Sequence, residues 1–368
     1  PATPAMAVLF NTSIATVQLT LSLYLFGLAI SQLLLGPLSD RFGRKPVLLA
    51  GLGITAVASF GAMFSTSIGM LILFRTLQAL GASSGLVIGR AVIRDLYSRE
   101  RSAAMIGLVT TVMVVAPMLA PMIGGIIDTH FGWEYTFALV GVAAAIVIGW
   151  ALLALPETRP DHVTGGGVLY IIGESRELLR DRRFLGYVLV CALGTSSYFA
   201  FLGAGPHVVV GMMARTSAEY GLWFMLSAAS FMVGNFITTR TVQRYGVDRM
   251  IAVGLVFQMI GAAATIAAVW LFPDGGPCTI FLPQIAMSVG NGIFLPNCVA
   301  GAVSVRPQAA GTASGITGFM QMSIGATAAQ VMSHLVANAT TAMPLAFVMA
   351  IVSTAATTAF YAFLRRRG

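Results

Sequence analysis

The chain has 368 residues, of which 57% are hydrophobic and only 9% are charged, and its mean hydropathy is +0.86. A soluble domain of this size needs far more charge to cover its surface, so the composition excludes the soluble classes and predicts an integral membrane protein. The net charge of +8 is compatible with nucleic acid binding in principle. The basic residues lie between apolar segments, however, and we therefore expect no nucleic acid partner.

Apolar segments follow one another along almost the whole chain. A helix needs roughly 20 apolar residues to cross a hydrocarbon core of about 30 Å, and eleven segments meet this length. They cover residues 16–38, 46–64, 68–92, 102–127, 134–155, 184–210, 219–239, 249–272, 278–303, 311–335 and 342–364. Residues 1–10, which precede them, are apolar but too short to cross. The sequence therefore predicts an all-α, polytopic membrane protein.

The Lys and Arg residues fall in every second connection between these segments. Those connections and the C-terminus hold 18 of the 21 basic residues, whereas the intervening connections hold only Arg215. By the positive-inside rule, the enriched connections and the C-terminus are cytoplasmic. Eleven spans then place Pro1 outside. The simplest explanation is that the first helix is largely missing and that residues 1–10 are its outer end; the alternative is a true eleven-span protein.

One long polar segment divides the chain. Residues 156–183 predict a cytoplasmic linker, partly helical from about Gly173, between an N-terminal bundle (1–155) and a C-terminal bundle (184–368). The two parts echo each other, because residues 41–43 (Arg-Phe-Gly) and 244–246 (Arg-Tyr-Gly) each occupy a turn between two spans. Two parallel bundles related by an axis along the membrane normal are a known plan of transporters.

The sequence has no pattern of an enzyme or of a metal site. All 13 acidic residues lie in loops or at the ends of spans, and there is no HExxH sequence and no Gly-rich phosphate-binding loop. Cys191, Cys278 and Cys298 have no metal-binding spacing. We expect no enzyme activity, no cofactor and no metal. Uphill transport then requires an ion gradient as its energy source.

Two arginines lie inside a predicted span. Arg75 is about seven residues into its segment, roughly 10 Å deep at 1.5 Å per residue. A charge at that depth is costly and normally has a partner or faces a water-filled cavity. We therefore expect Arg75 to face a central cavity, with Gln78 one turn further on; the alternative is snorkelling to the outer interface. Arg90, near the cytoplasmic end, is interpreted as a snorkelling anchor.

Prolines and glycines interrupt the next span at Pro117, Pro121, Gly124 and Gly125. Such kinks serve either packing or a flexing element of a transport cycle. The 19 methionines and several aromatic residues would form an adaptable apolar cavity wall, although core packing or lipid contact is the alternative for each one. The candidate cavity residues are Tyr24, Met113, Tyr198, Phe199, Phe201 and Asn297.

Residues 36–46 (GPLSDRFGRKP), between the first two spans, resemble the signature of the major facilitator superfamily. Residues 74–81 (FRTLQALG) resemble the fourth-helix motif of its drug/proton antiporters, and residues 117–125 resemble their fifth-helix motif, with Ala116 and Ala120 in place of the usual glycines. Residues 18–22, 94–97, 156–158 and 203–206 resemble the Bcr/CflA subgroup of bicyclomycin and chloramphenicol/florfenicol exporters.

The resemblance implies twelve helices in two six-helix bundles, which rock around a midplane cavity and exchange protons for drug. It implies a cytoplasmic latch, formed by Gly36, Asp40, Arg41, Gly43, Arg44, Lys45 and Arg94. In this latch Asp40 would pair with Arg94 or cap the helix that starts near Gly311. Gln243 stands at the position of Asp40 in the second half, so no latch is expected there. Arg75 would couple protons, and the carboxylate of the missing first helix would be absent.

A bacterial, multi-pass inner-membrane protein follows from this resemblance. Its expected partners are small lipophilic drug-like substrates, protons and membrane lipid, and it is expected to be a monomer. Two alternatives remain open. One is a facilitator for another small organic solute, such as a sugar or an organic acid. The other is a truncated, inactive exporter or a scaffold.

Overall fold

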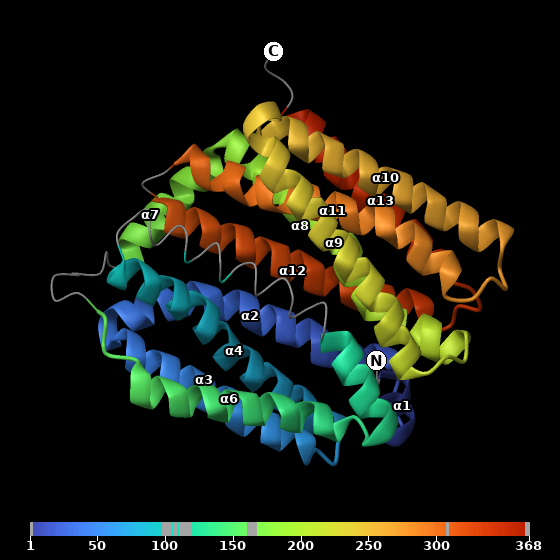
Figure 1. The fold of residues 1–368 in the computed structure, drawn as a ribbon, viewed down its shortest axis with the longest axis horizontal. Coiled ribbons are helices and arrows are strands. Elements are labelled where there is room, and N and C mark those ends of the chain that lie inside the picture. The colour runs from blue at the N-terminus through green and yellow to red at the C-terminus, as the bar shows by residue number, and fades with distance from the viewer. Residues whose placement is uncertain are drawn as a thin grey trace.

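The computed structural model describes residues 3–97, 105, 109, 120–159, 168–306 and 309–364, and these residues are almost entirely helical (Figure 1). The helices are α1 (Thr3–Leu9), α2 (Ile14–Phe42), α3 (Arg44–Met63), α4 (Ile68–Leu96), α6 (Glu134–Ala154), α7 (Val168–Arg180), α8 (Arg182–Pro206), the short π-helix η1 (His207–Met212), α9 (Ser217–Tyr245), α10 (Val247–Leu271), α11 (Cys278–Val305), α12 (Ala310–Val336) and α13 (Met343–Phe363). Residues 120–130 are also helical.

Polar residues at the predicted loops start several of these helices. Ser13, Ser67 and Thr216 accept hydrogen bonds from backbone N–H groups in the first turns of α2, α4 and α9. Asp181 caps α8 through Arg183 N (2.8 Å) and Phe184 N (3.0 Å). These caps satisfy N–H groups that have no partner within their own helix. The linker helix α7 begins at Val168, earlier than the expected start near Gly173.

Nine helices of the described part are long and apolar enough to cross a membrane. They correspond to nine of the eleven predicted spans. The predicted span 102–127 lies mostly outside the described residues. The predicted span 311–335 forms α12, which is not among the nine because polar residues such as Gln321, Gln330 and His334 reduce its apolar character.

The helices form two groups (Figure 1). The first contains α2, α3, α4 and α6, and the second contains α8 to α13. They meet along α2 and α12, which lie side by side. Ser22 of α2 donates to Gln330 Oε1 of α12 (2.9 Å), and Gln330 Nε2 donates to the carbonyl of Ala15 (3.0 Å). The polar residues of α12 therefore serve the contact between the two groups.

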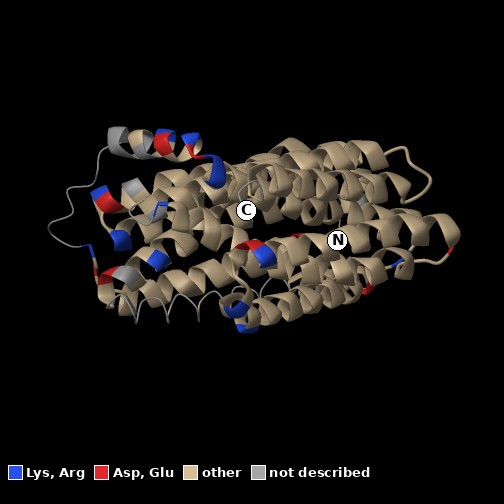
Figure 2. Ribbon diagram, turned by 90° about the horizontal axis from the view of Figure 1, so that it is seen from above, with Lys and Arg blue, Asp and Glu red and all other residues tan. Residues whose placement is uncertain are grey.

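Large apolar side chains cover the outside of the helices. On α6, Leu153 is 90% exposed and Trp150 is 78% exposed. An apolar outer surface of this extent requires a hydrocarbon surrounding. Figure 2 shows long stretches of helix without charged residues, and most of the basic residues lie in one half of the view. We call this end, with the α2–α3 turn, α7 and the α9–α10 turn, the basic end.

Candidate functional site

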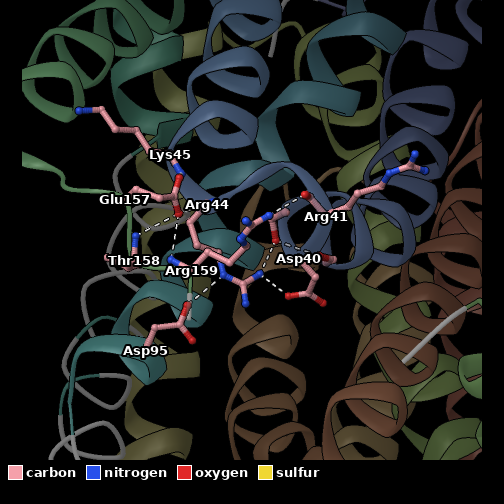
Figure 3. Close-up of polar contacts among 10 residues, drawn as sticks. Asp40, Arg41, Arg44, Lys45, Asp95, Glu157, Thr158 and Arg159 are labelled. Atoms are coloured by element: carbon pink, nitrogen blue, oxygen red, sulfur yellow. Dashed lines mark hydrogen bonds and ion pairs between the residues drawn. The ribbon is translucent and has the colours of Figure 1, made fainter. Parts of the chain in front are cut away.

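A buried arginine organises the α2–α3 turn at the basic end (Figure 3). Arg44, the first residue of α3, is only 3% exposed. Its Nη1 lies 2.6 Å from Asp40 Oδ1 and donates to Ser39 Oγ at 2.6 Å, and its Nε donates to Asp95 Oδ2 of α4 at 2.9 Å. A guanidinium with two carboxylates and a hydroxyl has enough partners to be held away from water. This contact joins the turn to α4.

The segment after α6 is attached to the same turn. The carboxylate of Glu157 accepts from the backbone N–H groups of Arg44 (2.8 Å) and Lys45 (3.2 Å). The guanidinium of Arg159 donates to the carbonyl of Arg41 (2.7 Å), and Lys45 Nζ donates to the carbonyl of Leu152 (3.1 Å). Partial burial disfavours the charged carboxylate of Glu157, but its bonds from the backbone N–H groups prevail and lower its pKa.

The turn itself depends on a glycine. Gly43 has φ +100°, a conformation that side chains rarely adopt, and a Cβ there would lie 2.6 Å from Glu157 Oε2. Gly246, in the equivalent α9–α10 turn, has φ +81°. The echo between the two halves therefore corresponds to the same backbone requirement. Gly36 lies within α2, and a Cβ there would meet no atom within 4 Å.

The ion pair of Asp40 differs from the one predicted from the sequence. The expected partners were Arg94 or the start of the helix near Gly311, whereas Asp40 pairs with Arg44 across the turn. The side chain of Arg94 lies outside the described residues, although its neighbour Asp95 contributes to the cluster.

Arg75 lies inside the first group of helices. Its guanidinium lies over the ring of Tyr24 of α2 (4.0 Å to the centroid) and near that of Phe137 of α6 (5.6 Å). It donates to Gln78 Oε1, and Gln78 Nε2 donates in turn to Ser59 Oγ of α3 (2.6 Å). Aromatic faces and a neutral amide thus stabilise the cation. No carboxylate of the described residues forms an ion pair with it.

The helical segment 120–130 closes against α9 at the end opposite the basic end. A Cβ on Gly125 would lie 2.4 Å from the carbonyl oxygen of Ser217, and a Cβ on Gly221 would lie 2.6 Å from that of Pro121. Backbone therefore touches backbone where the two groups of helices meet. We call this contact the Gly125–Gly221 crossing. Gly124 points elsewhere, because a Cβ there would meet nothing within 4 Å.

A cavity of about 400 Å³ lies between the two groups of helices. Its wall comes from α4, α8, α9, α11 and α12, mostly near the middle of each helix. The lining residues are Arg90, Thr195, Tyr198, Phe199, Phe224, Ser227, Ala228, Phe231, Ser288, Asn291, Leu295, Gln321 and Met322. Four of these 13 residues are aromatic and six others carry polar or charged side chains. Cavities that combine apolar walls with polar groups are typical of small-molecule sites.

The cavity contains some of the residues predicted from the sequence. Tyr198 and Phe199 line it, whereas Tyr24 contacts Arg75 instead. Phe201 is fully buried in the packing of the second group, 5.3 Å from Phe281 between ring centroids. Asn297 is also buried and donates to the carbonyl of Ile293 (2.6 Å).

Two of the predicted residues, Met113 and Pro117, lie outside the described residues. Arg75 does not line the cavity. Arg90, which the sequence led us to interpret as a snorkelling anchor, does line the cavity. The sequence did contain a signal that Arg90 belongs to a site: it lies fifteen residues after Arg75 on α4, and both arginines interrupt an apolar helix. Glu157 was also missed, because its partners are distant in the sequence.

The sequence pattern of the Major Facilitator Superfamily matches residues 1–330. The chain belongs to the major facilitator superfamily. This superfamily member is 30% identical over 358 residues to a bicyclomycin resistance protein homolog of Haemophilus influenzae, covering 95% of the chain and 87% of the relative. It is 32% identical over 314 residues to a chloramphenicol resistance protein of Pseudomonas aeruginosa, covering 84% and 71%.

The fold of this major facilitator protein is also that of solved transporters. The xylose transporter XylE of Escherichia coli, in a partially occluded inward-open conformation, matches with a TM-score of 0.76 at 13% identity, over 99% of this chain and 92% of the transporter. At this identity the likeness shows the fold alone. It agrees with the expected all-α, multi-pass architecture.

Proposed function

We propose that this protein is a multidrug exporter that moves small lipophilic molecules by alternating access. The cavity of about 400 Å³ between the two groups of helices carries this proposal, since the aromatic and apolar side chains in its wall suit varied lipophilic ligands. Resistance to bicyclomycin and to chloramphenicol, named for the two relatives, indicates the class of substrate. The protein acts as a transporter and not as an enzyme.

The Gly125–Gly221 crossing is the contact that would open during the cycle. The Gly125–Gly221 crossing closes one end of the cavity, while the cluster around Arg44 stabilises the helix turn at the basic end. Rocking of the two groups of helices about the cavity would open the crossing and move the drug outward. Pro121 and Gly124 lie in the helix beside the crossing.

A proton gradient supplies the energy. The sequence contains no loop that would hold a nucleotide phosphate. Arg75, held by Tyr24 and Gln78, is the charged group that responds when a nearby acidic group gains or loses a proton. A guanidinium beside aromatic rings favours a neighbouring anion, and protonation removes the charge of that anion. No cofactor takes part in this cycle.

The basic end lies in the cytoplasm, together with the C-terminus. The alternation of Lys and Arg along the sequence supports this orientation. The two relatives are bacterial proteins, and the inner membrane is the proposed location. Because the cavity lies within a single chain, the monomer is the proposed working unit, surrounded by lipid on its apolar outer surface.

Transport into everted membrane vesicles tests this function. Vesicles that contain the protein should accumulate chloramphenicol when respiration acidifies their interior, and a protonophore should abolish the accumulation. Arg75→Ala should abolish this response, whereas Arg240→Ala, an exposed arginine at the end of α9, should retain it. Accumulation that ignores the protonophore would reject proton coupling. Specific uptake of a sugar or an organic acid without any drug transport would reject the exporter.

A further inference from the structure

The cavity has a positively charged wall, and the residues that the structure describes add no acidic counterpart to it. Arg90 lines it from α4, and none of its described lining residues is Asp or Glu. No acidic residue of the described part forms an ion pair with Arg90. Arg90 is an exposed residue, although it belongs to a helix that is long and apolar enough to cross a membrane. A charge in a partly dehydrated space retains a strong field, because little water screens it.

Two buried polar groups of the cavity wall, on α9 and α11, have no partner among the described residues. Ser227 of α9 is 3% exposed and Asn291 of α11 is 5% exposed. Ser227 Oγ and Asn291 Oδ1 form no hydrogen bond with any described residue, although Asn291 Nδ2 donates to the carbonyl of Met287 (3.3 Å). Leaving such groups unpaired costs about 1–3 kcal/mol each. Both residues line the cavity, so a ligand that reached these atoms would remove this cost.

The aromatic rings of Tyr198 and Phe199 complete the site. Both belong to α8 and line the same cavity, with ring centroids 5.5 Å apart. Aromatic side chains supply most of the apolar contact area of such a site. The polar groups then fix the orientation of a ligand: Arg90 donates, Asn291 Oδ1 accepts, and the hydroxyl of Ser227 can do either.

We infer that Arg90 selects substrates by charge, so that the cavity binds uncharged or anionic aromatic molecules and rejects permanent cations. The preferred ligand carries a hydrogen-bond acceptor for Arg90 and a donor for Asn291. This inference rests on the proposed function for its physiological meaning, but it concerns binding alone. Two like charges a few Å apart at the effective dielectric of a protein repel by more than the free energy that separates affinities tenfold.

Equilibrium binding to the protein in lipid nanodiscs tests the inference without any gradient. The probes are radiolabelled chloramphenicol, which is uncharged, and tetraphenylphosphonium, a permanent cation of aromatic character. The unmodified protein should bind chloramphenicol more tightly. In Arg90→Met and Arg90→Gln, tetraphenylphosphonium should bind more tightly relative to chloramphenicol. The ratio of the two dissociation constants should change in favour of the cation by about tenfold or more. Arg90→Lys should keep the original ratio within about threefold, because it retains the charge.

Arg240→Met is the matched control, since it removes one exposed arginine at the end of α9, away from the cavity. It should leave the ratio unchanged. An unchanged ratio in both Arg90→Met and Arg90→Gln would overturn the inference, and so would an equal shift in Arg240→Met, or the absence of chloramphenicol binding to the unmodified protein. The selectivity can hold while vesicle transport ignores the protonophore, and in that case only the proposed proton coupling fails.

Discussion

Glu157 caps a helix that begins 113 positions before it in the sequence: its Oε1 accepts from the backbone N–H of Arg44 at 2.8 Å. The residue before α3 is Gly43, whose side chain cannot cap the helix. Glu157 therefore supplies the anion that the positive end of a helix favours. At the neighbouring end of α2, Arg159 donates to the carbonyl of Arg41. Each charge thus complements the helix end that it contacts, and the turn is attached to the segment after α6 (Figure 3).

Replacing Glu157 by Gln should therefore weaken the α2–α3 turn at neutral pH. The loss should be about 1 kcal/mol, as for other helix caps, because the amide lacks the charge and has only one oxygen to accept. Thermal unfolding of the purified protein in detergent, followed by circular dichroism, measures it. Glu177→Gln is the control, because Glu177 contacts Arg306 on the surface and caps no helix.

The effect of Glu157→Gln should also depend on pH. The folded protein holds the pKa of Glu157 below its ordinary value of 4.5, so the stabilisation is present above the unfolded pKa and disappears as pH falls through the lower folded pKa. The two proteins should thus differ in melting temperature at pH 7 and converge only at a pH below 4.5. A constant difference across this range would contradict the capping role.

The two carboxylates on Arg44 should differ in importance. The side chain of Asp95 is 9% exposed, whereas that of Asp40 is 34% exposed. Water compensates less for the loss of a buried partner, so Asp95→Asn should destabilise the protein by more than Asp40→Asn. We expect up to about 3 kcal/mol for Asp95→Asn and about 1 kcal/mol or less for Asp40→Asn. Melting temperatures of the two variants, measured side by side, decide the order, and the reverse order would show that Asp40 is the principal partner.

The spans could be predicted from the sequence because hydrocarbon imposes a length and an apolar composition on every helix. The helix α12 shows where this signal weakens. Gln330 lowers its apolar character, yet its amide is bonded to Ser22 and Ala15 of α2. A polar residue is tolerated there because a neighbouring helix satisfies it, and composition alone carries no information about that neighbour.

The partners within the candidate site were harder to predict. The signature around Asp40 located the turn, but the pairing with Arg44 and Asp95 depends on how α4 packs beside it. Arg75 and Arg90 look alike in sequence, since each is a charged residue flanked by apolar residues on α4. The structure distinguishes the two arginines. Tyr24 packs over Arg75, which is enclosed by one bundle, whereas Arg90 faces the cavity that we propose as the ligand site.

The Gly125–Gly221 crossing offers a test with an adjacent control. A methyl group at Gly125 would collide with the carbonyl oxygen of Ser217. This oxygen belongs to the backbone, so it cannot move aside as the end of a flexible side chain could. Gly125→Ala should therefore separate the two groups of helices at this end. Gly124→Ala should be neutral or slightly stabilising, because its methyl group meets no atom and alanine favours a helix by about 1 kcal/mol.

Labelling of a cysteine introduced at Ala218 by a membrane-impermeant maleimide measures this opening. Cys278 is exposed and is first replaced by Ser, whereas Cys191 and Cys298 are buried. The label should react several-fold faster in Gly125→Ala than in Gly124→Ala. Equal rates in the two variants would mean that this crossing does not control access.

Arg75 stacks on the ring of Tyr24. We therefore expect transport to require the aromatic ring at position 24 and not its hydroxyl group. The guanidinium carbon lies 4.0 Å from the ring centroid, and no hydrogen bond joins the two side chains within the described structure. Tyr24→Phe should therefore keep proton-driven accumulation of chloramphenicol within about twofold. Tyr24→Leu removes the negative face of the ring and about 1–2 kcal/mol of cation–π stabilisation, which should lower accumulation about tenfold. If Tyr24→Phe loses as much activity as Tyr24→Leu, the hydroxyl is needed for proton transfer, and Tyr24 has a chemical role beyond holding Arg75.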